Sequence, residues 1–418
     1  MRPIEFSEFT LPNGLHCIVH ENHTTPIVAV DLWYHVGSKN ERPDRTGFAH
    51  LFEHLMFQGS RHVGKTEHFA YIQRAGGTLN GTTNEDRTNF FETLPANQLE
   101  LALWLESDRM MSLDLSAENF ENQRQVVKEE RRMRYDNAPY GTVYERLHER
   151  AYFQHPYRWT TIGSMAHLDA ATLEEAQEFF NTYYVPNNAT LVLAGDVTAE
   201  EAEALVTRYF GDIPRGKDIV RPSDFDLPLT QEVRDTIYDN VQLAGLFIAY
   251  RICDVKHPDA DVLGVISRML SDGRSSRLYR NLVHTKQLAQ SVSALAAPAE
   301  HPGLFFINAI AAQGASLSEL EREIDAELQR LVNGDLSEEE LQKAKNGYEM
   351  GLLKSFSMVR SLADNLAYFH TFFGSAAEIN RELERATGIT LEDVQRVAKR
   401  YFSNVGRVVL HWLPKHNQ

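Results

Sequence analysis

Two histidines and a glutamate lie within five residues in the segment His50-Leu51-Phe52-Glu53-His54. The segment reads as helical, and on a helix side chains four residues apart leave the same face. His50 and His54 can therefore bind one Zn²⁺ at about 2.0–2.1 Å. Glu53 lies next to such a metal but is poorly placed to be a ligand from the same turn. A carboxylate there can take a proton from a metal-activated water and deliver it to a leaving amine, so we predict Glu53 as a general base.

The alternative is a helix whose histidines are merely packed or solvated, because an H-x-x-E-H pattern also arises by chance. Apolar residues surround the two rings: Leu51, Phe52, Leu55 and Met56. Buried imidazoles need polar partners, and one metal ion supplies a partner for both. We therefore favour the metal site.

A catalytic zinc ion needs a third protein ligand and an open fourth position. The best candidates are the two acids of Val126-Val127-Lys128-Glu129-Glu130, inside a helical pattern that runs from about Ala117 to Arg134. Glu130 shares the apolar face with Val126 and Val127. Glu129 also neighbours Val126, so the periodicity favours Glu130 only slightly.

Further patterns predict the elements that position these residues. Strand-like runs flank Asn13-Gly14, a hairpin turn signal, and residues 78–94 read as a second hairpin. Val28–Val36 reads as a strand, and a helix is predicted over Ala260–Leu282. Strands and helices mix without strict β-α-β alternation. We therefore predict an α+β fold in which each domain is a mostly antiparallel sheet covered by helices.

An internal repeat divides the chain. Thr172-Leu173-Glu174-Glu175-Ala176-Gln177 recurs 218 residues later as Thr390-Leu391-Glu392-Asp393-Val394-Gln395. Each copy reads as a helix capped by threonine and followed by a strand. A coincidence of common helix–strand chemistry is the alternative. A match at half the chain length predicts two similar domains, over 1–215 and 235–418, with a polar, proline-bearing linker over 216–234.

Composition excludes several classes of protein. The chain has 418 residues, of which 43% are hydrophobic, and this predicts a folded protein of two or more domains. We expect no membrane span, because no apolar run approaches the ~20 residues required. The net charge of −16 argues against nucleic acid as a partner. It indicates either simple solubility or a cavity that attracts basic peptides.

The cysteines and the N-terminus bear on the cellular compartment. Cys17 and Cys253 are the only cysteines, so a disulfide framework and a C-x-x-C metal site are excluded. Residues 1–5 lack the apolar region of a signal peptide. We therefore expect a cytoplasmic protein, or a periplasmic one if a leader has been removed.

The chain resembles the pitrilysin/insulinase family of zinc peptidases with an inverted motif (inverzincins), most closely the half-length members similar to mitochondrial processing peptidase subunits. The resemblance covers essentially the whole chain and rests on these segments: 47–57, 76–81, 126–130, 155–157, 162–163, 273–279 and 287–289. It implies His50 and His54 as ligands of one Zn²⁺ per chain and Glu53 as the base. The family's distal glutamate follows the second histidine by about 76 residues, which selects Glu130 over Glu129. The acid that the family often carries seven residues earlier is replaced here by Gln123.

The resemblance also implies how substrate binds. Asn80, Gly81, Thr82 and Thr83 match the edge strand on which this family lays a peptide or an unfolded polypeptide as an added strand. Main-chain hydrogen bonds then give affinity with little sequence selectivity. A purely structural hairpin is the alternative.

The second half departs from the family where substrate contacts are expected. Active members offer an arginine and a tyrosine, seven residues apart, that help bind the substrate carbonyl; the aligned positions hold Val283 and Gln290. Half-length members pair to form one clamshell. We therefore expect a zinc endopeptidase that works as a heterodimer with a paralogous subunit that supplies the arginine–tyrosine pair. An alignment slip, or a homodimer that works without the pair, is the alternative.

Two other functions compete with this expectation. Some relatives are non-catalytic structural or partner subunits of the same fold, and a zinc hydrolase of small amides is a third possibility. The four residues His50, Glu53, His54 and Glu130 are all present, which favours catalysis, and the match to the edge strand favours peptides.

Overall fold

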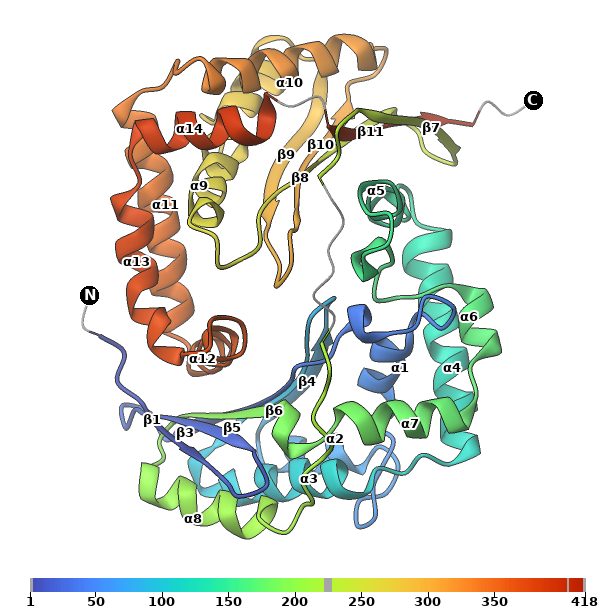
Figure 1. Ribbon diagram of the computed structural model, residues 1–418, viewed down its shortest axis with the longest axis vertical. Helices are drawn as coiled ribbons and strands as arrows, with labels where there is room; N and C mark the ends of the chain where they lie inside the picture. Colours follow the sequence, from blue (N-terminus) through green and yellow to red (C-terminus); the bar gives the residue numbers. More distant parts are fainter. Residues whose placement is uncertain (1–2, 222–227, 404–405, 416–418) are drawn as a thin grey trace. The chain divides into compact units, whose positions relative to one another are not determined.

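The computed structural model describes residues 3–221, 228–403 and 406–415 of the chain. These residues form two compact units, each built from one sheet and the helices packed against it (Figure 1). Unit 1 comprises Met1–Arg132, Trp159–Ser223 and Lys354–Asn380, and unit 2 comprises Met133–Arg158, Asp224–Leu353 and Arg381–Gln418. The predicted architecture of helix-covered sheets is confirmed.

Unit 1 holds a six-stranded sheet. Its strands in spatial order are β1 (Ser7–Thr10), β2 (His16–Glu21), β6 (Ala189–Gly195), β3 (Ile27–Tyr34), β5 (Thr88–Pro95) and β4 (Thr78–Thr83). β2 and β6 are parallel and the other neighbours are antiparallel. β3 is buried along nearly its whole length because helices cover both faces of the sheet. β4 forms one edge, so one side of its backbone is open to an added strand.

Helices from distant parts of the chain cover this sheet. α3 (Leu99–Ser112) and α8 (Ala199–Phe210) lie on one face, and α12 (Val359–Phe373) lies on the other (Figure 1). Arg109 of α3 contacts Phe90, whereas Phe372 of α12 contacts Trp33, which pairs with Asn89. Neighbouring residues 89 and 90 point to opposite faces of a strand, so these contacts identify the two faces.

Unit 2 repeats the sheet of unit 1. Its strands in spatial order are β7 (Val233–Asp239), β11 (Arg407–Pro414), β8 (Gly245–Arg251), β10 (Leu304–Ala311) and β9 (Ala289–Ala297). The first pair is parallel and the others are antiparallel, which is also the pattern of β2-β6-β3-β5-β4. α7 (Leu173–Tyr183) and α14 (Leu391–Phe402) both begin with a threonine capping box. The repeat seen in the sequence therefore marks two sheets of one topology.

The two halves of the chain exchange one helix each. α5 (Val143–Ala151), from the first half, packs on β8 and β11 of unit 2, and α12, from the second half, packs on the equivalent strands β3 and β6 of unit 1. The compact units therefore interleave along the chain, whereas the predicted domains 1–215 and 235–418 have a single boundary. Those domains stay a prediction, and residues 222–227 of the predicted linker lie outside the described residues.

One predicted element is wrong in length. The helix expected over Ala260–Leu282 ends early, because α9 spans Asp259–Ser271 and a separate π-helical turn spans Tyr279–Thr285. Gly273 between them has φ +76°, a left-handed conformation that a helix interior does not accommodate. Among the described helices, none has the length and apolar character needed to cross a membrane.

Candidate metal centre

His50 and His54 project from α1 (Phe48–Leu55) in unit 1. The opposite side of α1 is apolar, and Phe52 packs on Phe179 and Tyr184 in and beyond α7. This packing explains why the polar side chains of the helix leave its other face. The structure thus confirms a helix at the position that the motif requires.

A buried carboxylate fixes the start of α1. Glu41 accepts hydrogen bonds from the backbone N–H groups of Gly47 (3.0 Å) and Ala49 (2.8 Å), which satisfies donors that a helix start leaves free. Gly47 has φ +99°, and a Cβ atom there would lie 3.1 Å from the carbonyl oxygen of Ile162. Glycine is therefore required at this helix start.

The third predicted ligand comes from α4 (Ala117–Arg131), which packs against α1. Glu130 Oε2 lies 3.4 Å from His54 Nε2 and 3.7 Å from His50 Nε2. The acid next to it in sequence, Glu129, points away and pairs with Arg132 at 2.9 Å. On this helix Val127 is buried and Val126 is exposed. Glu130 therefore shares the buried face of α4 with Val127 and not with Val126.

The donor atoms of His50, His54 and Glu130 converge to a degree that fits zinc. All lie within 4.8 Å of one another. Four ligands arranged tetrahedrally around Zn²⁺ at 2.0–2.1 Å are separated by about 3.3 Å, close to the observed spacings. Side-chain exposures of 13%, 23% and 18% show that the group is partly accessible to solvent, as a catalytic site requires.

Glu53, the predicted base, lies on α1 and its side chain contacts the edge strand β4. Thr83 donates a hydrogen bond from Oγ1 to Glu53 Oε2 at 2.6 Å. Burial raises the pKa of Glu53, and the Thr83 hydrogen bond and the charges of His54 and Arg87 oppose this rise. A Cβ atom on Gly81 would lie 3.1 Å from Glu53 Cγ, so the glycine leaves the space that the Glu53 side chain needs.

The register of the β4–β5 hairpin shows which main-chain groups of β4 are open. Asn84 at its tip donates its N–H to the Arg87 carbonyl at 3.0 Å, and pairing alternates from there along the strands. Asn80 and Thr82 therefore bond to β5, whereas the main-chain groups of Gly81 and Thr83 face the open edge. The four residues predicted to bind substrate thus form an edge strand beside the predicted metal ligands, and two of them present their backbone outward.

Arg87 supports the edge strand and was not among the predicted site residues. Its Nη1 donates to the Thr82 carbonyl (2.9 Å) and to Asn89 Oδ1 (3.0 Å), and its guanidinium lies 5.0 Å from the centre of the Trp33 ring. Arg87 thereby stiffens β4 from the face opposite Glu53. A charged residue after a turn is usually solvated, so no sequence signal distinguished it.

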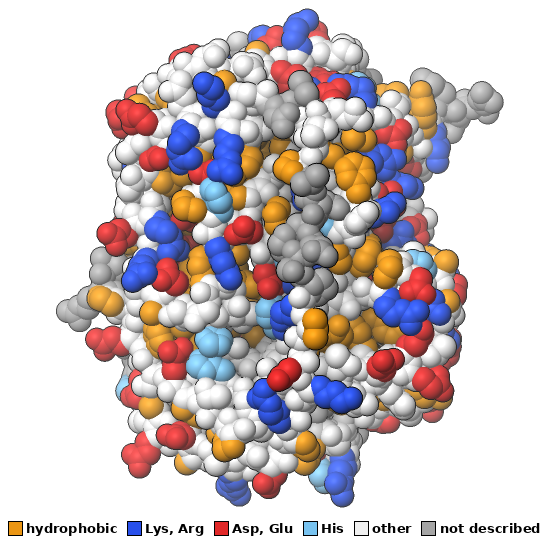
Figure 2. Space-filling view, viewed as in Figure 1, with side chains coloured by type: hydrophobic (Ala, Val, Ile, Leu, Met, Phe, Trp, Pro, Cys, Tyr) orange, Lys and Arg blue, Asp and Glu red, His pale blue; other side chains and the backbone are white. Residues whose placement is uncertain are grey.

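The acidic excess is not gathered on the face shown in Figure 2. Asp and Glu side chains are interspersed there with Lys and Arg on each unit. Both interpretations of the acidic excess, simple solubility and a cavity that attracts basic peptides, stay predictions.

Comparison with known proteins places the chain in a family. Residues 17–164 match the model of the insulinase family (peptidase family M16), and residues 170–348 match the model described as the peptidase M16 inactive domain. The zinc protease PqqE of Helicobacter pylori is 30% identical over 406 residues, which are 94% of this chain and 90% of that protein. The chain therefore belongs to peptidase family M16, in agreement with the resemblance seen in its sequence.

Two further relatives agree with this family and with the fold. A probable mitochondrial-processing peptidase subunit beta of Arabidopsis thaliana is 25% identical over 408 residues, covering 94% of this chain and 75% of that protein. The crystal structure of a protease from Helicobacter pylori superimposes with a TM-score of 0.94 at 28% identity, covering 98% of this chain and 100% of that one.

Proposed function

We propose that this chain is the zinc-bearing subunit of a heterodimeric endopeptidase that hydrolyses peptides or unfolded polypeptides. The observation that carries the proposal is the convergence of His50, His54 and Glu130 beside Glu53 and an open edge strand. Relatives named zinc proteases support the same chemistry.

The chain's own residues position the substrate and transfer the proton that peptide hydrolysis requires. A peptide added along β4 would hydrogen-bond to the outward main-chain groups of Gly81 and Thr83. It would replace the Asn80 side chain, whose Oδ1 accepts the Gly81 N–H at 2.9 Å. Thr83 holds Glu53 Oε2 at 2.6 Å, which leaves Oε1 to accept a proton.

Glu53 transfers one proton from water to the leaving amine, so the bonds formed and broken in the proposed hydrolysis balance. His50, His54 and Glu130 would hold Zn²⁺, which would supply a Lewis acid that lowers the pKa of water toward about 7. Glu53 takes one proton from the attacking water while a C–O bond forms at the peptide carbonyl. Glu53 then gives the proton to the amine nitrogen as the C–N bond breaks, so one water is consumed for each peptide bond.

A second subunit is proposed because the aligned arginine and tyrosine positions cannot stabilise a developing oxyanion. Val283 packs against the apolar core of unit 2, and Gln290 is exposed on β9. Neither side chain offers the charge of a guanidinium or a phenolic donor. The relative named as a beta subunit of a processing peptidase supports pairing.

The competing function is a non-catalytic subunit of the same fold. The match of residues 170–348 to a domain described as inactive favours it for the second half, whereas the candidate ligands all lie in the first half. Cleavage of an unfolded polypeptide should be measured for the pure chain and for the chain with its paralogue. We expect strong activity only for the pair. Full activity of the lone chain would refute the two-subunit proposal, and inactivity of both would favour the non-catalytic subunit.

A further inference from the structure

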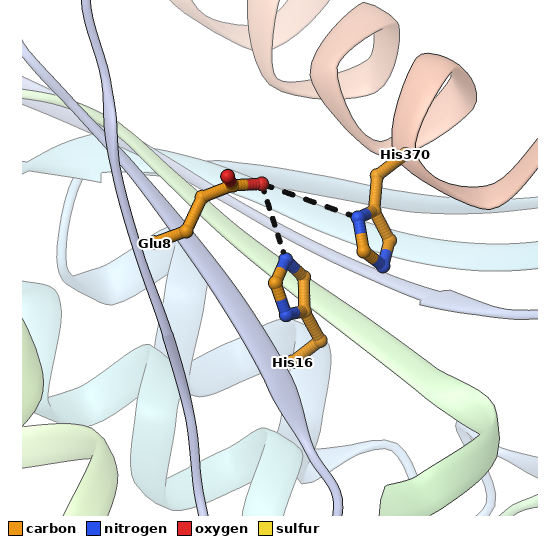
Figure 3. Close-up of side chains that lie close together, drawn as sticks. All are labelled: Glu8, His16 and His370. Carbon is orange, nitrogen blue, oxygen red and sulfur yellow. Dashed lines mark hydrogen bonds and ion pairs between the residues drawn. The ribbon is translucent and has the colours of Figure 1, made fainter. Parts of the chain in front are cut away.

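A second group of ligand-type side chains lies in unit 1 at the sheet edge opposite β4. Glu8 of β1, His16 of β2 and His370 of α12 point toward one another (Figure 3). Glu8 Oε1 is 3.3 Å from His16 Nε2 and 4.0 Å from His370 Nδ1. Strands β6, β3 and β5 separate this edge from β4, so the group is distinct from His50, His54 and Glu130.

The fold builds this group from three elements. Glu8 pairs with Ile18, two residues from His16, so the pleat places Glu8 and His16 on the same face of the β1–β2 hairpin. α12 covers that face and stacks His370 on His16, with ring centroids 3.8 Å apart and planes 6° apart. The Thr10 hydroxyl lies 3.0 Å from His16 Nδ1, which orients the ring so that Nε2 faces Glu8.

The polar atoms of this group are incompletely satisfied by protein partners. His370 Nδ1 is buried, makes no hydrogen bond with any described residue, and faces Glu8 across 4.0 Å, beyond hydrogen-bonding distance. An ion bound at this atom would satisfy it.

We propose that Glu8, His16 and His370 form a second metal site, which takes a divalent transition-metal ion such as Zn²⁺ through Oε1, Nε2 and Nδ1. Two imidazoles and one carboxylate are a donor set that such ions prefer. The Glu8–His16 spacing of 3.3 Å already suits zinc. The stacked rings are parallel, so His370 must turn about its Cβ–Cγ bond for both nitrogen lone pairs to meet one ion.

An ion at this position would have a structural consequence. It would join α12, which comes from the second half of the chain, to the N-terminal β1–β2 hairpin. Ile4 and Asn380 already connect the same regions by two hydrogen bonds, at 2.6 and 3.0 Å. The proposed ion therefore stabilises the packing of the exchanged helix and takes no part in hydrolysis.

The test measures zinc in full-length chains whose first site is disabled. In a His50→Ala/His54→Ala chain, equilibrium dialysis followed by elemental analysis should find about one zinc ion per chain, and zinc should raise the melting temperature. Adding His370→Ala should weaken this binding more than about 100-fold, since loss of a residue that merely orients a ligand already costs 10–100-fold. Adding Thr10→Val should weaken it by about 10-fold or more.

A matched control distinguishes the site from general binding to surface histidines. His20 lies on the same strand, and its Nδ1 bonds to the Glu5 carbonyl at 2.7 Å, so adding His20→Ala should leave the zinc content unchanged. Circular dichroism and melting without zinc establish that each variant is folded. Absence of zinc from the His50→Ala/His54→Ala chain, or equal retention after His370→Ala, would overturn the proposal. Equal loss in the His20→Ala variant would reveal only adventitious binding and would also overturn it.

Discussion

Thr83 donates a hydrogen bond to Glu53 at 2.6 Å and so joins the edge strand β4 to the helix that carries the two histidines. The strand proposed to hold substrate and the proposed base are thereby fixed to each other. A displacement of Thr83 would also displace Glu53. Substitutions at the contact between them are therefore a sensitive test of the mechanism.

Replacing Thr83 by valine keeps the shape of the side chain and removes its hydroxyl. A hydrogen bond to a charged group contributes about 1.5–3 kcal/mol, so we expect kcat/KM to fall roughly 10- to 100-fold while the zinc content is unchanged. Thr83→Ser keeps the donor and should remain within a few-fold of the parent. If the valine variant matches the serine variant, the hydroxyl does not position Glu53.

Gly81→Ala tests the space beside the base. The added methyl group would lie 3.1 Å from both Glu53 Cγ and the Phe90 ring, so one of them must move. We expect peptide hydrolysis to fall by about 10-fold or more, because small displacements of a catalytic group are costly. Gly388→Ala, where the methyl group would meet nothing within 4 Å, is the control. Equal activity of both variants would show that Glu53 tolerates the displacement.

The pKa of Glu321 in α10 (Leu317–Val332) indicates how low pH affects the stability of unit 2. Burial would raise its pKa, but hydrogen bonds from His411 and Arg234 and the charge of Arg407 outweigh burial and lower the pKa to about 2. The folded pKa lies below the unfolded value, so this stabilisation is complete above about pH 4.5 and is lost as the pH falls through about 2.

The corresponding variant is Glu321→Gln. It should lower the free energy of unfolding by roughly 1–3 kcal/mol at pH 7, because solvent screening reduces the full effect of the shift, and the difference from the parent should shrink as the pH falls. Urea unfolding at several pH values measures this difference. Glu319→Gln on the same helix, whose partner Arg322 is 68% exposed, should have little effect. A difference that does not depend on pH would contradict the assigned shift.

Local patterns were sufficient for much of the site. The spacing of His50 and His54 specifies one face of a helix, and the flanking apolar residues specify which face is buried, so α1 could be predicted. The β4–β5 hairpin and the repeated helix–strand units likewise follow from patterns within a few residues of each other. These features depend on neighbours in sequence.

Features that depend on packing could not be predicted in the same way. Glu129 and Glu130 differ by one position on a helix, so periodicity separated them only slightly and the family spacing was needed to choose Glu130. The packing of α4 on α1 places Glu130, and not Glu129, beside the histidines. Arg87 is an ordinary charged residue until β3 and β5 bring Trp33 and Asn89 beside it. No local sequence pattern indicates the exchange of α5 and α12, because an amphipathic helix can pack its apolar face on either sheet.

Zinc content and peptide hydrolysis of a Glu53→Gln chain, measured together in the presence of the paralogous chain, test most directly whether His50, His54 and Glu130 hold a catalytic metal served by Glu53. Glutamine keeps the size of the side chain and cannot accept the proton. We predict an unchanged zinc content at the first site and a fall in kcat of about 10²–10⁴-fold. Unchanged turnover with zinc bound would remove Glu53 as the base and contradict the proposed mechanism.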